Sequence, residues 1–465
     1  MTLSRFSETE TEAFYDAEDS LYRSFWDSEG SLHWGYFQDL KAQTPTDFIP
    51  ACHRWNEYML ETSGITASSK VLDVGCGNGN TAIWLAQQTG CEVIGIDLSA
   101  VRVNNAIAKA EVFPNLRVQF QKASATQLPF DDGTFTHVWS QATLYHVHQR
   151  EAALAEIYRV LKNRGIFLFD DLTTPQKPVS AKARQYTYDR LLFEPADSHD
   201  EYIDRLCQLG LMVVQSKDLN QHLYKSYDML SQLAKDQYPD LSAAYERMCE
   251  VIEMGELGWS FFEGEKVSDR LSWIYETSNT ETLEARYDAW ARIYDAELDK
   301  PYRISPIRSA GVLAKAVPDQ SAAILDAGAG TGMIGEALAE LGYDNLTAID
   351  LSPEMLEVAR QKGVYQALEI ANLDQPIQLF PPESFEAIVA VGVFTFGHAS
   401  PNGLLNLDVL LKRGGYFVLT VRANYYESNT DFRTVLDQLS WTQVNQEQFN
   451  IFDTEEMYCL TFQKS

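Results

Sequence analysis

Two stretches of the chain repeat one pattern of apolar and polar positions. In each stretch a short apolar run leads into a glycine-rich turn, VLDVGCGNG at 71–79 and ILDAGAGTG at 324–332. Each turn is followed by apolar residues at helical spacing, and then by a second apolar run that stops at an acid. The pattern predicts the same succession in both places: strand, glycine turn, helix, strand.

The two copies keep the same register. Their first glycines, Gly75 and Gly328, lie 253 residues apart, and each stands 22 residues before its acid, Asp97 or Asp350. A unit that recurs once, at so long a period, does not indicate a solenoid. We therefore expect two domains of one fold.

Further apolar runs continue each copy as an alternation of strands and helices. An Ala-, Leu- and Glu-rich stretch at 151–162 lies between two of the predicted strands, as a right-handed crossover requires. This order predicts an α/β fold with two Rossmann-like domains in tandem. The additional strands are expected near 136–141, 165–171, 386–392 and 415–422.

The domain boundary is expected in the polar, turn-prone segment near 275–283. We divide the chain into domain 1, residues 1–277, and domain 2, residues 278–465. Domain 1 is longer by a segment of about 172–258, which is too apolar to be disordered. We predict a mainly helical cap over the first site there, containing one strand, LMVVQS.

Composition narrows the classes of partner and of cellular location. The 465 residues are 45% hydrophobic and 22% charged, which is typical of a soluble globular protein. A net charge of −29 disfavours nucleic acid and anionic membranes as partners. No run is long enough to span a membrane and no secretory signal is visible, so a cytoplasmic protein is expected. The sequence specifies no oligomeric state.

The cysteines and histidines indicate no metal site. Six cysteines and eight histidines are scattered along the chain without the spacings of zinc or other metal motifs. The cysteines are typical of reduced thiols. We predict that the protein binds no metal.

The glycine turns predict a nucleotide-like cofactor. Glycines let the backbone approach a ligand, the helix N-terminus attracts a negative group, and the acid after the second strand suits ribose hydroxyls. NAD, FAD and S-adenosylmethionine satisfy all three features. A dinucleotide fingerprint carries a third glycine where Asn80 and Met333 stand. Both copies instead read GxGxG, with an acid two residues before the first glycine. A NAD-dependent oxidoreductase therefore stays a remote alternative.

These motifs resemble those of class I S-adenosylmethionine-dependent methyltransferases across most of both domains. The resemblance implies that the aspartates after the second strands hold the ribose and that the glycines lie beneath the methionine part. The segments SATQLPF and ANLDQPI stand where the family places adenine, with Ser124 replacing the usual Asp. The cofactor-binding residues it implies are Asp73, Gly75, Gly77, Gly79, Asp97, Leu98, Ser124, Ala125 and Gln141 in domain 1, and Tyr287, Asp326, Gly328, Gly330, Gly332, Asp350, Leu351, Asn372 and Leu373 in domain 2.

Each domain also resembles a narrower subgroup. In domain 1, LYRSFW, HWGYF, SQATLYHV and GWSFFE are similar to sarcosine/dimethylglycine N-methyltransferases. In domain 2, RYDAWARIYDAEL and VGVFTFGHASP are similar to Williams–Beuren-region methyltransferase-like proteins. The tandem layout is similar to that of phosphoethanolamine N-methyltransferases.

Two histidines are the candidate catalytic bases. His146 and His398 follow the fourth predicted strand of their domains, at the sheet edge where ligands bind. Each is either a base or substrate anchor, or a histidine that only hydrogen-bonds the backbone of a turn. The N-terminal segment of domain 1 is rich in aromatic residues and could close over the cofactor as a lid. From it we choose Tyr22, as a catalytic and cofactor residue, and Trp26, as a cofactor residue. Tyr287 has the corresponding part in domain 2.

Two arginines of the cap are weaker candidates. Arg184 or Arg190 could bind a substrate carboxylate, because a guanidinium supplies a bidentate donor. For each of them taken singly, a solvated surface side chain is the favoured interpretation.

The expected function is S-adenosylmethionine-dependent methyl transfer to a small molecule. The resemblance implies nitrogen of a small amine or amino acid as the acceptor of domain 1, while oxygen and carbon stay open. Domain 2 is expected to be a second methyltransferase. In the alternative, one domain is catalytic and the other is a cofactor-binding scaffold.

Overall fold

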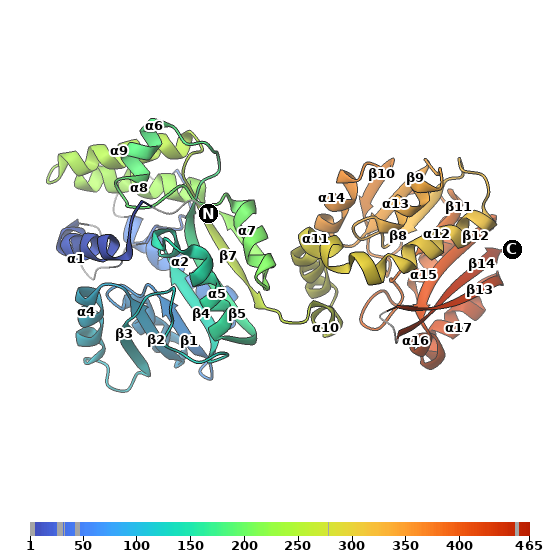
Figure 1. Ribbon diagram of the computed structural model, residues 1–465, viewed down its shortest axis with the longest axis horizontal. Coiled ribbons are helices and arrows are strands. Elements are labelled where there is room, and N and C mark those ends of the chain that lie inside the picture. The colour runs from blue at the N-terminus through green and yellow to red at the C-terminus, as the bar shows by residue number, and fades with distance from the viewer. Residues whose placement is uncertain (1–4, 26–30, 32, 42–46, 278, 452–454) are drawn as a thin grey trace. The chain divides into compact units, whose positions relative to one another are not determined.

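The chain folds into two compact units, Met1–Ser268 and Asp269–Ser465. From here on, domain 1 and domain 2 denote these two units, in place of the division at 277/278 that the sequence suggested, and each is described by itself. Figure 1 shows the course of the chain. The computed structural model describes residues 5–25, 31, 33–41, 47–277, 279–451 and 455–465, without the side chains of 18–25 and 299–302.

Domain 1 is built on a seven-stranded sheet with the order β3-β2-β1-β4-β5-β7-β6. The first five strands are parallel, and β7 runs antiparallel to both of its neighbours. The strands are β1 (Lys70–Val74), β2 (Glu92–Asp97), β3 (Val118–Lys122), β4 (Phe135–Gln141), β5 (Leu161–Thr173), β6 (Leu211–Asp218) and β7 (Gly258–Lys266).

Helices cover both faces of this sheet and its carboxyl edge. They are α1 (Glu8–Phe25), α2 (Phe48–Ser63), α3 (Asn80–Thr89), α4 (Ala100–Ala110), α5 (Arg150–Val160), α6 (Ala181–Ala183), α7 (His199–Gln208), α8 (Asn220–Ala234) and α9 (Pro239–Glu253). Two short turns complete the domain: a 3-10 turn at Leu144–His146 and a π-helical turn at Arg184–Tyr188.

The cap consists of two insertions instead of one. The predicted cap strand LMVVQS is β6, the edge strand of the main sheet, and α7 connects β5 to it. One insertion therefore precedes α7 and contains α6 and the π-helical turn. The other lies between β6 and β7 and contains α8 and α9, which lie side by side in Figure 1.

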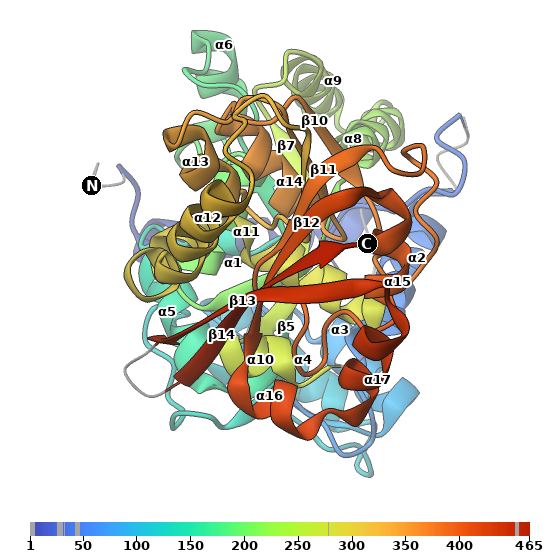
Figure 2. The same ribbon diagram turned by 90° about the vertical axis from the view of Figure 1, so that its right-hand side faces the viewer.

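Domain 2 has a sheet of the same order, β10-β9-β8-β11-β12-β14-β13. Its last two strands form a direct antiparallel hairpin, so it lacks the second insertion of domain 1 (Figure 2). The strands are β8 (Ile324–Ala327), β9 (Leu346–Asp350), β10 (Ala367–Ile370), β11 (Phe385–Ala390), β12 (Leu411–Arg422), β13 (Trp441–Ile451) and β14 (Glu455–Lys464). The helices are α10 (Arg270–Tyr275), α11 (Thr280–Tyr302), α12 (Ile304–Ala316), α13 (Met333–Glu340), α14 (Pro353–Gln361), α15 (Gly403–Leu410), α16 (Ala423–Ser428) and α17 (Thr430–Gln438).

The core of each domain lies on both faces of its sheet. In β1, Val71 packs into one buried cluster and its neighbour Leu72 into another, because successive side chains point to opposite faces. Strands buried on both faces read as continuous apolar runs, which is the pattern that the sequence shows. The two α/β domains of Rossmann-like type predicted from the sequence are confirmed.

The described part of the chain holds neither a membrane-spanning helix nor a cluster of metal ligands. No described helix is long and apolar enough to cross a membrane. No group of metal-ligating side chains occurs among the residues whose placement is given.

Candidate active sites

The glycine loop and the acid after the second strand are joined in the same way in both domains. In domain 1 the backbone N–H of Gly77 donates to Asp97 Oδ2 at 2.9 Å, and Ser99 N–H donates to Oδ1 at 2.8 Å. In domain 2 Gly330 N–H donates to Asp350 Oδ2 at 2.7 Å, with a matching bond from the residue after Leu351. The equal sequence spacing thus corresponds to equal geometry.

A cavity opens above each glycine loop. In domain 1 it measures about 140 Å³, and in domain 2 about 270 Å³. Each extends from the loop, past the acid, to the histidine after the fourth strand. The predicted residues that line them are Asp73, Gly75, Gly77, Asp97, Leu98, Ser124, Ala125, Gln141 and His146 in domain 1, and Tyr287, Gly328, Gly330, Asp350, Leu351, Asn372, Leu373 and His398 in domain 2.

The acid before each glycine loop differs between the domains. Asp73 lines the domain 1 cavity, and its buried Oδ2 has no hydrogen-bond partner among the described residues. Burial, followed by the charge of Asp97, raises the pKa of Asp73 to about 7. Asp326 lies outside the domain 2 cavity lining. Its Oδ2 accepts a hydrogen bond from Tyr365 Oη at 2.5 Å, and its buried Oδ1 has no partner among the described residues. A cation in the domain 1 cavity could therefore pair with Asp73, whereas Asp326 does not reach the domain 2 cavity.

A tyrosine of the first helix meets the candidate histidine of domain 1. Tyr15 Oη and His146 Nε2 form a short hydrogen bond, and their rings meet edge to face. His146 is 7% exposed, and burial lowers its pKa to about 3, with the charges of His148 and Arg102 adding to the effect. The imidazole is therefore neutral at neutral pH.

Domain 2 repeats this tyrosine–histidine pair. Tyr287 Oη lies 2.6 Å from His398 Nε2, and His398 Nδ1 lies 3.0 Å from the carbonyl oxygen of Phe396. Because a carbonyl can only accept, the ring proton of a neutral His398 sits on Nδ1 and the Tyr287 hydroxyl donates to Nε2. Burial lowers the pKa of His398, in the same direction as in domain 1.

In each domain the aspartate after the tyrosine connects the tyrosine's helix, α1 or α11, to the loop on the ribose side of the cavity. Asp16 accepts a hydrogen bond from Ser99, the N-cap of α4, and Asp288 accepts one from Ser352, the N-cap of α14. From the sequence we predicted Tyr22 in domain 1 and missed Tyr15. A signal for it is the tripeptide YDA, which occurs at 15–17, 287–289 and 294–296.

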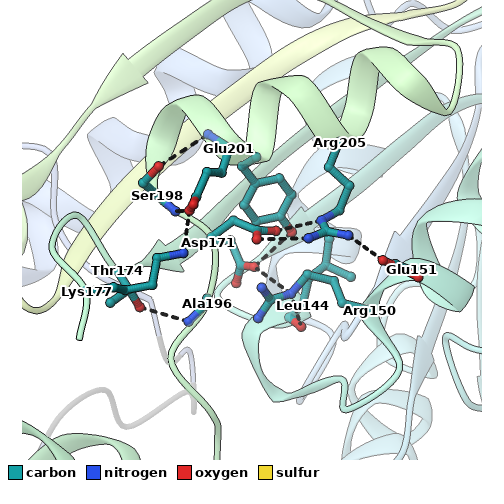
Figure 3. Close-up of polar contacts among 12 residues, drawn as sticks. Leu144, Arg150, Glu151, Asp171, Thr174, Lys177, Ala196, Ser198, Glu201 and Arg205 are labelled. Carbon is teal, nitrogen blue, oxygen red and sulfur yellow. Dashed lines mark hydrogen bonds and ion pairs between the residues drawn. The ribbon is translucent and has the colours of Figure 1, made fainter. Parts of the chain in front are cut away.

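A buried carboxylate holds the turn that carries His146. Asp171, at the end of β5, accepts hydrogen bonds from Tyr145 N–H at 2.8 Å and from Tyr202 Oη at 3.0 Å. Arg150 approaches the same carboxylate at 4.0 Å. Burial raises the pKa of Asp171 to about 7. Figure 3 shows this carboxylate beside the side chains of α5 and α7, so three elements fix the position of the turn.

The remaining predicted residues have varied placements. Gly79 and Gly332 lie outside the cavity linings and are the N-caps of α3 and α13. Ser124, expected beside adenine, hydrogen-bonds Glu8 of α1. The Tyr22 side chain and Trp26 lie outside the described residues.

Comparison with known families gives two matches to one model. A family model described as "Methyltransferase domain" matches residues 72–169 and 325–419. These ranges contain both glycine loops, both acids and both histidines.

Several curated proteins are similar to the chain. A glycine/sarcosine/dimethylglycine N-methyltransferase of Actinopolyspora halophila is 30% identical over 236 residues, which are 49% of this chain and 40% of that protein. A 27-O-demethylrifamycin SV methyltransferase of Amycolatopsis mediterranei is 30% identical over 218 residues, 46% of this chain and 77% of that protein. The chain covers only 40%, 56% and 39% of the length of three curated relatives that it matches.

A solved structure supports the fold. The structure of a putative sarcosine dimethylglycine methyltransferase from Galdieria sulphuraria has a TM-score of 0.50 and 19% identity. The match covers 54% of this chain and 99% of that one.

The residues of both cavities fit S-adenosylmethionine. A Cβ added at Gly77 or Gly330 would meet no atom within 4 Å, so the space above each loop is open to a ligand. The free carboxylate oxygen of Asp73 suits the positive charge of this cofactor, and Asp97 and Asp350 stand where ribose hydroxyls bind. The chain therefore belongs to the S-adenosylmethionine-dependent methyltransferases, with two copies of their methyltransferase domain.

Proposed function

We propose that domain 1 methylates the nitrogen of a small amine or amino acid, and that domain 2 is a second working methyltransferase. The observation that carries this proposal is the tyrosine–histidine pair, which is present in both cavities and neutral in both. The similarity to a glycine/sarcosine/dimethylglycine N-methyltransferase supports nitrogen as the acceptor atom of domain 1.

The side chains of domain 1 would prepare the acceptor for an in-line displacement. When bound, S-adenosylmethionine supplies a methyl group that is already activated on a sulfonium. The acceptor nitrogen must present a lone pair, so it must be unprotonated and correctly oriented. Tyr15 Oη can accept an N–H of the amine while His146 keeps the hydroxyl oriented. After transfer the product leaves as the ammonium and loses its surplus proton to water.

The cavity would also exclude water from the reaction. Helix α1 lies over it through Tyr15, Asp16 and Glu8, which contact three different loops at the carboxyl edge of the sheet. A dry cavity strengthens each hydrogen bond inside it and prevents side reactions.

The proposal is tested by following the methyl group. The full chain is incubated with S-adenosylmethionine carrying a trideuterated methyl, together with glycine, sarcosine, dimethylglycine, ethanolamine or phenol, and products are identified by mass spectrometry. We expect label on the nitrogen of at least one amine, lost in Asp97→Ala and kept in Asp350→Ala. Label on phenol alone would refute nitrogen as the acceptor atom.

The raised pKa of Asp73 predicts a pH dependence of cofactor binding in domain 1. A bound cation favours the ionised carboxylate, so its affinity rises with pH until the free pKa of about 7 and is level above it. Calorimetry from pH 5.5 to 8.5 with S-adenosylmethionine measures this, and Asp73→Asn is expected to remove the slope. An affinity that falls over this range would contradict the prediction.

A further inference from the structure

We propose that the domain 2 cavity binds an acceptor with a carboxylate on an apolar body, and that Arg422 binds that carboxylate. The inference rests on the proposed function of domain 2 as a second methyltransferase. It goes further in naming the chemical class of the acceptor and the residue that selects it.

Arg422 occupies a position that differs in chemistry between the two domains. Ser140 pairs with Phe169 on β5, and in the same register Ala390 pairs with Leu419 on β12. Three residues further on, the equivalent positions are Leu172 in domain 1 and Arg422 in domain 2. Leu172 is fully buried, whereas Arg422 lines the cavity that reaches the glycine loop.

The two positions before Leu172 and Arg422 also differ in charge between the domains. In domain 1, Asp170 comes before Asp171 and Leu172, and it accepts hydrogen bonds from the indoles of Trp55 and Trp259 at 2.7 and 2.9 Å. It therefore faces protein donors and is absent from the cavity lining. In domain 2 Thr420 is equivalent to Asp170 and Val421 is equivalent to Asp171, and neither is charged. The end of this strand thus carries two carboxylates in one domain and one guanidinium in the other.

The guanidinium of Arg422 is held in place but keeps donors for a ligand. Nη2 donates to Tyr275 Oη at 3.0 Å, Nη1 pairs with Glu455 at 2.9 Å, and the Tyr275 ring lies 4.6 Å from the guanidinium carbon. These contacts engage two of the five N–H groups of the side chain. Arg422 has 20% of its side chain exposed, so it remains reachable.

The walls of the cavity define the rest of the ligand. Arg422 and His398 are the basic side chains among the described lining residues, and His398 is kept neutral by burial and by the charge of Arg422. The carboxylates Asp350 and Asp374 also line it, and both accept hydrogen bonds from backbone N–H groups. Apolar residues are contributed by α10, by the turn after β11 and by the last hairpin: Leu271, Ile274, Val393, Phe394, Ile451 and Met457. A planar guanidinium above an apolar wall is suited to a carboxylate on an apolar body.

The test uses three one-ring probes that differ in their head group: phenylacetate, phenylacetamide and 2-phenylethylamine. Their dissociation constants are measured by ligand-observed NMR on the full chain saturated with S-adenosylhomocysteine. We expect phenylacetate to bind about tenfold more tightly than phenylacetamide. Arg422→Gln is expected to bring that ratio close to one. Arg360→Gln, which removes an exposed arginine of domain 2 that is paired with Glu357 outside the cavity lining, is the matched control and should leave the ratio unchanged.

A second variant acts in the opposite direction. Glu455→Gln removes the internal counter-charge of Arg422, so it should increase the preference for phenylacetate several-fold. Equal binding of phenylacetate and phenylacetamide, failure of all three probes to bind, or a preference that survives Arg422→Gln would overturn the inference. Calorimetric binding of S-adenosylhomocysteine to domain 2 is measured on the same samples. Its absence refutes the proposed function, whereas normal cofactor binding without a head-group preference refutes only this inference.

Discussion

Replacing His146 by alanine is expected to slow amine methylation by domain 1 about 10²- to 10³-fold while leaving cofactor affinity nearly unchanged. Tyr15→Phe should lower kcat to a similar degree, because both substitutions remove the hydrogen bond between His146 and the hydroxyl that contacts the acceptor. The double variant should be little slower than either single variant, since the two residues act as a unit. Steady-state kinetics with the acceptor identified by the labelling experiment, combined with calorimetry for the cofactor, measure both quantities.

A second buried histidine provides the control for this prediction. His137 in β4 is 6% exposed, and burial lowers its pKa to about 4, but it lies outside the cavity and bonds the Ser63 carbonyl. His137→Ala should therefore lower stability without a comparable loss of kcat. If His137→Ala and His146→Ala slow the reaction equally, the effect of His146 is structural and the proposed role fails.

Gly75→Ala is expected to lower the free energy of unfolding of domain 1 by about 2–4 kcal/mol and to abolish its cofactor site. Gly75 has a φ of +78°, and a Cβ there would lie 2.1 Å from Thr143 Oγ1. The cost combines a strained backbone with a collision at the turn after β4. Gly328→Ala should act likewise in domain 2, where the Cβ would lie 2.4 Å from Val393 Cγ2.

A substitution at Gly77 distinguishes an effect on stability from an effect on cofactor binding. A Cβ at Gly77 would meet no protein atom within 4 Å, although its φ of +53° is also positive. Gly77→Ala should thus cost only about 1 kcal/mol of stability, while the added methyl enters the space assigned to the cofactor. Differential scanning calorimetry with and without S-adenosylhomocysteine distinguishes the two variants. Equal losses of stability in Gly75→Ala and Gly77→Ala would contradict the collision that we assign to Gly75.

Much of the fold could be predicted from the sequence because its determinants are local. Strands buried on both faces give apolar runs, and in each domain one helix with its connecting turns separates the glycine turn from the acid. The two copies therefore share the step of 22 residues from Gly75 to Asp97 and from Gly328 to Asp350. The strand at 211–218 was misplaced in the cap because an insertion separates it from its antiparallel partner β7.

The parts of the site that depend on distant segments were harder to predict. Tyr287 precedes its glycine loop by 41 residues, but Tyr15 precedes Gly75 by 60, so the spacing that aligns the cores does not align the first helices. Arg422 could not be singled out either, since its relation to Leu172 depends on strand register. Which side chain enters a cavity is decided by tertiary packing, not by local pattern.

The central claim is that both domains bind S-adenosylmethionine through the same loop-and-acid geometry. It is tested most directly by calorimetric titration of the full chain with S-adenosylhomocysteine, beside the variants Asp97→Ala and Asp350→Ala. We expect two sites per chain, with one lost in each variant, because each aspartate anchors its own glycine loop. A single site in the unaltered chain, or two sites that persist in both variants, would contradict the account.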